Sequence, residues 1–152
     1  MKFFADSMLG KLTRWLRLMG FSVEYATPDK NDTEILSYCR QNSLILLTRD
    51  RELSQRYKDS LYIKSDDYRD QIKVFIGNHE PSEELFFSRC PLCNSELEII
   101  PMEIFKGDVP DGIREKYTRV FHCSNCGKVY WEGSHFDSIR KALKEIISET
   151  VP

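Results

Sequence analysis

Short apolar runs and amphipathic segments alternate along the first half of the chain. Apolar or alternating runs predict strands at residues 3–5, 22–26, 44–47 and 61–63, and helical periodicity predicts helices at 8–19, 32–41, 51–58 and 68–76. Gly20 is placed to end the first helix. Strands separated by helices are typical of βαβ units, so we expect an α/β domain with a parallel sheet over residues 1–78.

The pattern changes at residues 77–82, a polar stretch that contains both glycine and proline and predicts a domain boundary. Beyond it, short strand-like runs at 85–87, 97–100, 119–121 and 129–131 surround four cysteines, and residues 107–112 are typical of an exposed loop. Apolar residues at 136, 139, 143, 146 and 147 share one face of a helix. We therefore expect an amphipathic C-terminal helix over residues 134–149 that packs back on the body.

The four cysteines form two Cys-x-x-Cys pairs, Cys90/Cys93 and Cys123/Cys126. Each pair is followed by a residue type that tolerates positive φ, as a sharp turn around one ion requires. Tetrahedral zinc accepts four sulfurs at about 2.3 Å, and paired spacings of this kind supply them. We predict a zinc ribbon over residues 85–133. Because four thiolates leave zinc no open position, the zinc is expected to be structural. The fifth cysteine, Cys39, is expected to be a small buried hydrophobe of a helix.

Composition limits the classes of partner. Of 152 residues 41% are hydrophobic and 30% are charged, and the net charge is −2, so any binding of nucleic acid must use a local basic patch. No apolar run reaches the roughly 20 residues of a membrane span, and the start of the chain does not resemble a secretory signal. Paired thiols without an export signal are better explained as metal ligands than as disulfides, and we expect a cytoplasmic protein.

Three aspartates mark one edge of the predicted sheet. Asp6 and Asp50 directly follow apolar strands, and Asp32 opens a helix that begins at the same edge, where open parallel sheets bind ligands. Clustered carboxylates are the ligands that Mg²⁺ or Mn²⁺ prefers, and such an ion can activate water for hydrolysis of a phosphodiester. The alternative is that Asp32 and Asp50 only cap their helices.

Basic residues accompany this edge. Lys11, Arg14 and Arg17 recur every three residues on the first helix, and Arg49 and Arg51 flank the aspartate that follows the third strand. A positive rim beside a carboxylate centre would hold a phosphate backbone, so these five residues are candidate RNA-binding residues. The alternative for the helix is an ordinary solvated face.

Four segments, in this order, resemble the RNase domain family named for the C-terminal part of the Mut-seven exonuclease: residues 6–17 (DSMLGKLTRWLR), 46–50 (LLTRD), 89–94 (RCPLCN) and 129–135 (VYWEGSH). The resemblance spans residues 2–143. It implies a PIN-like parallel-sheet domain with helices on both faces, a four-cysteine zinc ribbon, and an Mg²⁺- or Mn²⁺-dependent endoribonuclease that acts on single-stranded RNA. By position, Asp6, Asp32 and Asp50 match the acidic residues that bind the catalytic metal. A fourth acidic position has no clear match, and Asp66 and Asp67 are the candidate substitutes.

Two other functions stay open on the sequence. A non-catalytic RNA-binding or adaptor protein would use the ribbon as its working part, with Tyr130 and Trp131 stacking on bases and His135 contacting phosphate. A phospho-acceptor domain would also place aspartates at strand ends. Alternatively, Trp131 is buried beside the second cysteine pair, and Ser134 caps the final helix.

Overall fold

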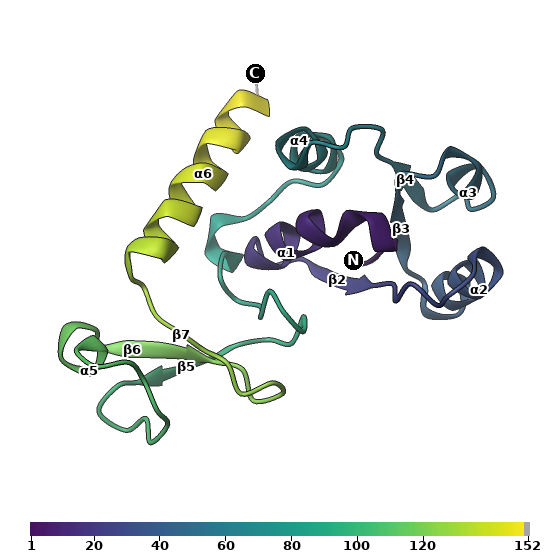
Figure 1. Ribbon diagram of the computed structural model, residues 1–152. Coiled ribbons are helices and arrows are strands. Elements are labelled where there is room, and N and C mark those ends of the chain that lie inside the picture. Colours follow the sequence, from purple (N-terminus) through teal and green to yellow (C-terminus); the bar gives the residue numbers. More distant parts are fainter. Residues whose placement is uncertain (151–152) are drawn as a thin grey trace.

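The first half of the chain forms a four-stranded parallel sheet. The computed structural model describes residues 1–150. The strands β1 (Lys2–Ala5), β2 (Ser22–Tyr25), β3 (Ile45–Thr48) and β4 (Ser60–Tyr62) lie in the order β2-β1-β3-β4, and every neighbouring pair is parallel (Figure 1). β1 and β3 are therefore the central strands, and their carboxyl ends lie side by side.

Helices cover both faces of this sheet. They are α1 (Gly10–Leu18), which follows a short 3₁₀ turn η1 (Ser7–Leu9), α2 (Asp32–Asn42), α3 (Arg51–Gln55), α4 (Tyr68–Asn78) and the C-terminal α6 (Ser134–Thr150). Neighbouring side chains of a strand point to opposite faces. Phe3 accordingly packs with residues of α1, α4 and α6, whereas Phe4 packs with residues of α2 and α3. The predicted α/β fold, with helices on both faces of a parallel sheet, is confirmed.

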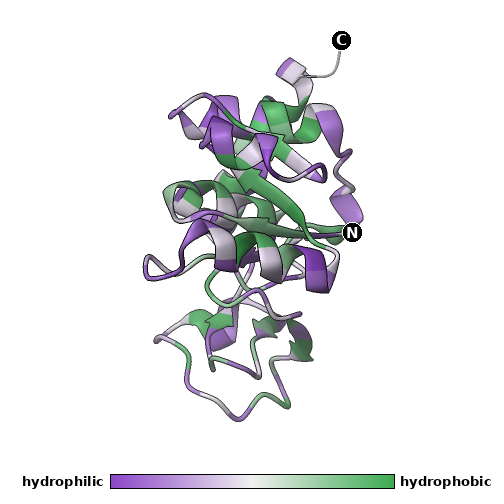
Figure 2. Cartoon of the chain, turned by 90° about the vertical axis from the view of Figure 1, so that its right-hand side faces the viewer, coloured by the Kyte–Doolittle hydropathy of each residue, from purple (hydrophilic) through white to green (hydrophobic). Residues whose placement is uncertain are grey.

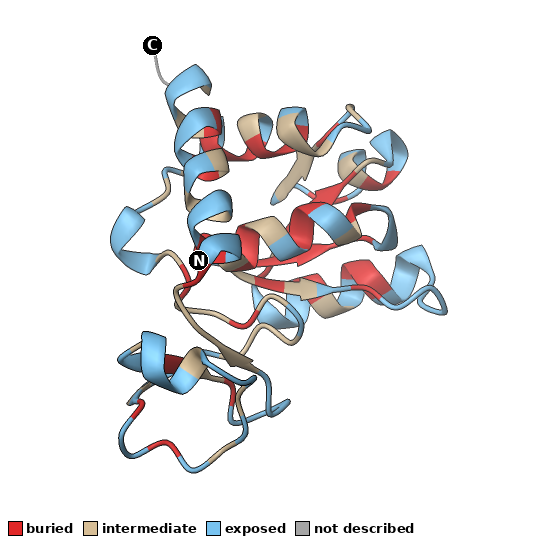
Figure 3. Cartoon of the chain, turned by 60° about the vertical axis from the view of Figure 1, so that its left-hand side comes forward, coloured by how far each residue is buried: buried red, intermediate tan, exposed pale blue. Residues whose placement is uncertain are grey.

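The cores coincide with the apolar runs of the sequence. Figure 2 shows hydrophobic residues gathered in the strands of the parallel sheet, with hydrophilic residues on the outer sides of the helices. Figure 3 shows buried residues concentrated in the same sheet and in α1. Cys39 of α2 is fully buried, and burial raises the pKa of its thiol to about 11, so it behaves as a small apolar side chain.

The C-terminal helix α6 returns to the sheet domain and lies beside α4 (Figure 1). Leu143 and Ile146 are completely buried in the core that α1 and α4 share. Near the end of α6, Glu149 forms an ion pair with Lys73 of α4 at 2.8 Å. The helix thus connects the second half of the chain to the first through an apolar stripe, as its periodicity indicates.

The second half contains a smaller, antiparallel sheet. Its strands are β5 (Glu98–Pro101), β6 (Arg119–His122) and β7 (Val129–Tyr130), in the order β5-β6-β7, with the short helix α5 (Ile113–Lys116) between β5 and β6. Met102, Phe105 and Val120 form its small core. Because this core is small, the second half needs another source of stability, such as a bound metal.

One predicted strand is absent. Residues 85–87 do not form a strand, since a 3₁₀ turn η2 covers Glu83–Leu85 and Phe87 has a positive φ of 63°. The Phe87 amide donates to the Leu18 carbonyl oxygen at 2.7 Å, and its ring stacks on Phe136 with the centroids 3.5 Å apart. This apolar run therefore contacts the helices α1 and α6 and does not pair with another strand within residues 1–150.

Gly20 ends α1 as predicted, and two conditions require a glycine there. Its φ is +94°, which L side chains rarely adopt, and its amide donates to the Arg17 carbonyl oxygen at 2.9 Å. A Cβ at this position would lie 2.5 Å from the carbonyl oxygen of Leu85. The turn after the first helix is therefore packed directly against the segment that leads into the ribbon.

His79, just after α4, gives the fold a predicted pH dependence. Its ring lies 4.9 Å from that of Phe3 and 5.1 Å from that of Phe75, and burial lowers the pKa of the imidazole below its usual value. The unfolded chain therefore binds a proton more readily than the folded chain, and the free energy of unfolding should fall as the pH drops below about 6.5. Urea denaturation between pH 5 and 8 measures this slope. His79→Leu should reduce it, and His135→Leu, at an exposed site, should not; equal slopes in both variants would contradict the prediction.

Candidate functional site

Asp6 occupies the end of the central strand β1 and is held by three hydrogen bonds. The residue is only 7% exposed. Its Oδ1 accepts from the amide of Met8 at 2.9 Å, and its Oδ2 accepts from the hydroxyl of Thr48 and from the amide of Arg49 at 3.2 Å. These three hydrogen bonds hold the Asp6 carboxyl group in one orientation at the edge where open parallel sheets bind ligands.

Thr48 connects Asp6 to the second aspartate of this edge. Thr48 is the last residue of β3 and is completely buried. Its hydroxyl donates to the Asp6 carboxylate and accepts from the amide of Asp50 at 2.9 Å. Asp50 itself is exposed and caps α3, since its Oδ1 accepts from the amide of Leu53 at 3.1 Å. The alternative in which Asp50 caps its helix is thus confirmed, and within residues 1–150 no group donates a hydrogen bond to its second carboxylate oxygen.

Asp32 lies apart from this pair. It is the first residue of α2, and the neighbouring Asn31 caps that helix by accepting from the amide of Glu34 at 2.9 Å. The side chain of Asp32 is 53% exposed and lies 3.9 Å from the guanidinium of Arg56. The alternative in which Asp32 itself caps its helix is therefore wrong by one residue.

The three aspartates are not gathered into one ligand set. Within residues 1–150, the single group of three or more His, Cys, Asp or Glu side chains close enough to hold an ion is the cysteine cluster described below. Of the two acidic residues named as substitutes, Asp67 caps α4 by accepting from the amide of Asp70 at 3.2 Å, and Asp66 is exposed. Among the described residues, the aspartates therefore do not form a closed metal site made of protein ligands alone.

Two of the candidate basic residues lie at this same edge. The amide of Arg49 contacts Asp6, and its Nη2 donates to the Lys64 carbonyl oxygen at 3.3 Å, beyond the end of β4. The Nε of Arg49 is buried and has no hydrogen-bond partner among the described residues. Arg51 is exposed in the first turn of α3. The cationic side chains of Arg49 and Arg51 at this edge are suited to an anionic substrate.

On α1 the predicted basic stripe is divided. Lys11 and Arg14 are exposed, and the Lys11 ammonium lies 4.0 Å from the ring centroid of Tyr68. The prediction that Arg17 shares this exposed stripe is wrong, because Arg17 is only 7% exposed. The ribbon covers this part of the helix, which local periodicity could not indicate.

Arg17 instead joins the two halves of the chain. Its Nε donates to the Val23 carbonyl oxygen of β2 at 2.8 Å, and its Nη1 donates to the carbonyl oxygens of Pro91 and Leu92 at 3.1 and 3.2 Å. Burial lowers the pKa of the guanidinium, and the nearby thiolates of Cys93 and Cys90 oppose that shift. Arg17 thus places a positive charge beside the cysteine cluster.

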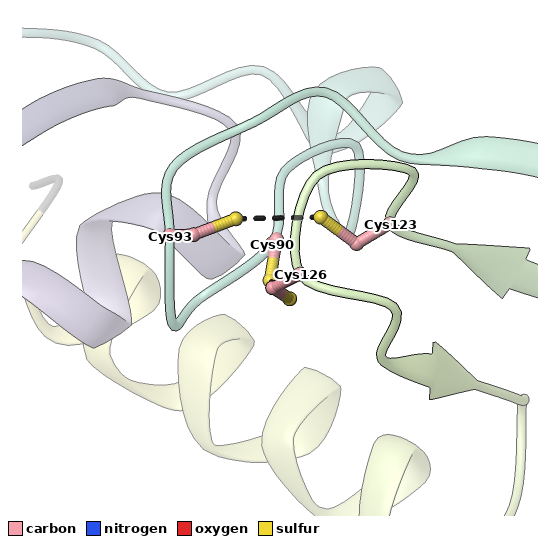
Figure 4. Close-up of side chains that lie close together, drawn as sticks. All are labelled: Cys90, Cys93, Cys123 and Cys126. Carbon is pink, nitrogen blue, oxygen red and sulfur yellow. Dashed lines mark hydrogen bonds between the residues drawn. The ribbon is translucent and has the colours of Figure 1, made fainter.

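The four cysteines of the two pairs converge from opposite sides (Figure 4). None of the four is in a disulfide, and their sulfurs lie within 4.8 Å of one another. The Cys90 and Cys126 sulfurs are 3.7 Å apart, and those of Cys93 and Cys123 are 3.3 Å apart. Four sulfurs at about 2.3 Å from a tetrahedral ion would be about 3.8 Å apart, so the cluster fits such an ion.

The two cysteine turns have the same backbone hydrogen bonds. The amide of Asn94 donates to the Cys90 carbonyl oxygen at 2.9 Å, and the amide of Gly127 donates to that of Cys123 at 2.8 Å. Asn94 and Gly127 have φ values of 72° and 80°, as the sharp turn was expected to require. The repeated geometry aims two thiols from each turn at one point, and we call these turns the first and second knuckle.

The first knuckle also contacts β2 through Asn94. Its side-chain oxygen accepts from the amide of Val23 at 3.0 Å, and its side-chain nitrogen donates to the hydroxyl of Ser22 at 3.2 Å. Both the N–H and the C=O of Val23 therefore have side-chain partners: the N–H donates to Asn94, and the C=O accepts from Arg17. The cysteine cluster is therefore attached to the sheet through two polar side chains.

Sequence reasoning missed Thr48 and the role of Asn94. Thr48 could have been found as a hydroxyl at the end of the most apolar strand, directly before Arg49 and Asp50. The sequence indicates only that the position of Asn94 tolerates positive φ, and nothing local pairs this residue with β2.

Of the other expected residues, Trp131 is half-buried and His135 is exposed at the start of α6. Ser134 is the first residue of that helix.

Comparison with known proteins gives a family. Within residues 1–150 no helix is both long and apolar enough to cross a membrane. No match was found among curated proteins or among solved structures. A family model described as the Mut7-C RNAse domain matches residues 1–143, nearly the whole chain. The segments that suggested this resemblance include Asp6, Asp50 and the first cysteine pair, Cys90 and Cys93. The chain belongs to the Mut7-C RNAse domain family.

Proposed function

We propose that the chain is a ribonuclease that hydrolyses phosphodiester bonds within single-stranded RNA and depends on Mg²⁺ or Mn²⁺. The observation that carries this proposal is the buried Asp6 carboxylate, linked through Thr48 to Asp50 at the open edge of the two central strands. Family membership supports a ribonuclease role for the same chain. Sheets of this type bind their ligands at that edge.

Asp6 and Asp50 are the proposed metal ligands, with Asp32 as a third from the neighbouring helix. Mg²⁺ is commonly bound through one or two carboxylates together with waters and substrate phosphates, so a gathered set of three is not required. An ion held there would supply an activated water and neutralise charge that develops on the phosphate. The Thr48 hydroxyl donates to the Asp6 carboxylate and would keep it in one orientation toward the ion.

The basic residues would hold the substrate. Arg49 and Arg51 flank Asp50 at the carboxylate edge, and Lys11 and Arg14 extend the positive surface along α1. Because the net charge of the chain is −2, this local surface must provide the attraction for the phosphate backbone. Arg17 is not part of it, since its guanidinium is engaged by backbone oxygens.

The metal of the cysteine cluster is proposed to be zinc with a structural role. Four thiolates satisfy a tetrahedral ion and leave no position for water or substrate. The hydroxyl of Tyr130 also lies 3.3 Å from the Cys90 sulfur, as expected for an outer partner of a ligand. The two metals would thus have separate tasks, one in chemistry and one in folding.

Cleavage of a labelled single-stranded RNA tests the proposal. Desalting should remove weakly bound metal without a chelator, which would also attack the zinc site. We expect cleavage only after Mn²⁺ or Mg²⁺ is added, and Asp50→Asn should lower the rate at least about tenfold. Asp59→Asn is the matched control, because Asp59 is an exposed aspartate next to the opposite end of the same sheet.

Three results would contradict the proposal. They are metal-independent cleavage, cleavage by Asp50→Asn at the wild-type rate, and no cleavage at all under conditions in which RNA binds. The last result would favour the non-catalytic RNA-binding protein.

A further inference from the structure

Two hollows cross the surface of α1 and meet at the first knuckle. The first, about 440 Å³, lies between α1, the first knuckle, β7 and α6. The second, about 510 Å³, lies between α1, the end of β2 and the same knuckle. Lys11, Arg14, Pro91 and Leu92 line both hollows. Because these four residues line both, the two hollows are adjacent, and together we call them the α1 groove.

The groove begins at the carboxylate edge. Gly10 and Tyr25 line the second hollow, and the Tyr25 hydroxyl donates to the carbonyl oxygen of Ser7, the residue after Asp6. From Gly10 to Leu18, which lines the far hollow, α1 rises about 12 Å. A strand whose phosphate lies at Asp6 and Asp50 could therefore continue directly into the groove.

The far hollow combines an apolar floor with a positive rim. Trp15, Tyr130 and Phe136 contribute to its walls, and none of the described residues that line it is acidic. Its cationic lining residues are Lys11, Arg14, Arg89 and Lys128. In a chain with more acidic than basic residues, such a one-sided lining indicates an anionic ligand.

Two of these four cations are engaged and two are available to a ligand. The Lys11 ammonium lies 4.0 Å from the ring centroid of Tyr68. Arg89 is already used, since its Nη1 donates to the Asn94 carbonyl oxygen at 2.9 Å and its Nη2 pairs with Glu96 at 3.6 Å. The side chains of Arg14 and Lys128 are exposed and make no hydrogen bond or ion pair with any residue in the range 1–150. The first-knuckle residue Leu92, which is 48% exposed, lines the same hollow as these two cations.

We propose that the α1 groove binds a stretch of single-stranded RNA that flanks the scissile phosphate, with an unstacked base in the far hollow. Flat apolar bases fit aromatic and aliphatic walls, and the phosphates between them fit Arg14 and Lys128. An RNA duplex keeps its bases stacked inside and cannot fill such a hollow. This inference rests on the proposed function, because the carboxylate edge fixes where the strand enters.

Binding should be measured by anisotropy of a labelled single-stranded 12-nucleotide RNA, without added Mg²⁺ or Mn²⁺ so that no cleavage occurs. Lys128→Glu and Leu92→Asp should each weaken binding about tenfold at low salt, and Lys128→Glu should also reduce the salt slope by about 1 or more. Lys106→Glu and Ile104→Asp, exposed ribbon positions outside the groove, are the matched controls and should bind as wild type.

Trp15 offers a second readout that does not depend on these variants. The chain has two tryptophans, so Trp131→Phe leaves Trp15 as the reporter. The single-stranded RNA should quench its fluorescence, and a duplex of equal length should not.

The outcomes separate the groove from the catalytic proposal. Groove-dependent binding without cleavage under any metal would support the groove and overturn the catalytic function. Binding by both groove variants equal to their controls, with metal-dependent cleavage intact, would overturn the groove alone. Competition by poly-glutamate as strong as by RNA would show a site for acidic peptides, and would also overturn the groove proposal.

Discussion

Replacing Cys123 with serine is expected to abolish metal binding at the cysteine cluster and to unfold the ribbon. A tetrahedral zinc held by four thiolates contributes an apparent binding free energy of about 10–16 kcal/mol, which a small domain converts into folding free energy. The ribbon has few buried apolar residues of its own, with Met102, Phe105 and Val120 at its centre. Loss of one ligand should therefore remove more stability than that core can replace.

Metal content by elemental analysis and amide hydrogen exchange together measure this effect. Amides of β5 and β6 should lose protection in Cys123→Ser, whereas those of β1 and β3 should keep most of theirs. Cys39→Ser is the matched control, because Cys39 is a buried cysteine of α2 far from the cluster in sequence and outside its ligand set. It should keep the full metal content. A Cys123→Ser protein with normal metal content and a protected ribbon would show that the cluster does not hold the second half together.

Substituting Asp6 with asparagine is expected to lower RNA cleavage by at least about 100-fold. Mutation of outer-shell partners alone typically costs about 10–100-fold in metal affinity or activity, and Asp6 is proposed as a direct ligand. An amide carries no charge, and its NH₂ group would face the Thr48 hydroxyl or the Met8 or Arg49 amide, all of which now donate to the carboxylate. The variant should therefore also lose some stability, on the order of 1–3 kcal/mol.

Thr48→Val separates the two effects of this substitution. It removes the hydroxyl between Asp6 and the Asp50 amide and leaves the carboxylate charge in place. We expect a comparable loss of stability in urea denaturation and a much smaller loss of cleavage than in Asp6→Asn. If the two variants lose cleavage in proportion to stability alone, Asp6 has only a structural role.

The parallel sheet could be predicted because each strand and helix is encoded locally. Phe3 and Phe4 point into opposite cores, and the alternation of apolar runs with helical stripes fixes both faces. Where the prediction failed, a contact distant in sequence decided the structure. Residues 85–87 are apolar enough for a strand, but Phe87 stacks on Phe136 of α6 and its amide binds Leu18 of α1. A prediction from neighbouring residues cannot take these distant partners into account.

Only part of the geometry of the candidate site could be predicted from the sequence. Strand ends located Asp6 and Asp50, since a carboxylate directly after a buried strand is visible in the pattern. The prediction placed Arg17 on the exposed stripe because helical periodicity separates only apolar from polar faces. In the structure the first knuckle, more than 70 residues later in the chain, covers this polar position. Asp32 is exposed because Asn31, and not Asp32, caps α2. Either residue type can cap a helix, so the sequence does not decide between these neighbours.

The bonds from Asn94 and Arg17 to Val23 have a consequence for the isolated sheet. β2 is an outer strand, and these two side chains occupy the N–H and C=O that a further strand would use. Exposed strand edges are templates for pairing with another chain and hence for aggregation. If the cluster holds zinc as proposed, loss of the ion would unfold the first knuckle and open this edge. Zinc should therefore protect the protein from self-association, and light scattering of the metal-depleted chain should rise at concentrations at which the zinc-loaded chain stays monodisperse.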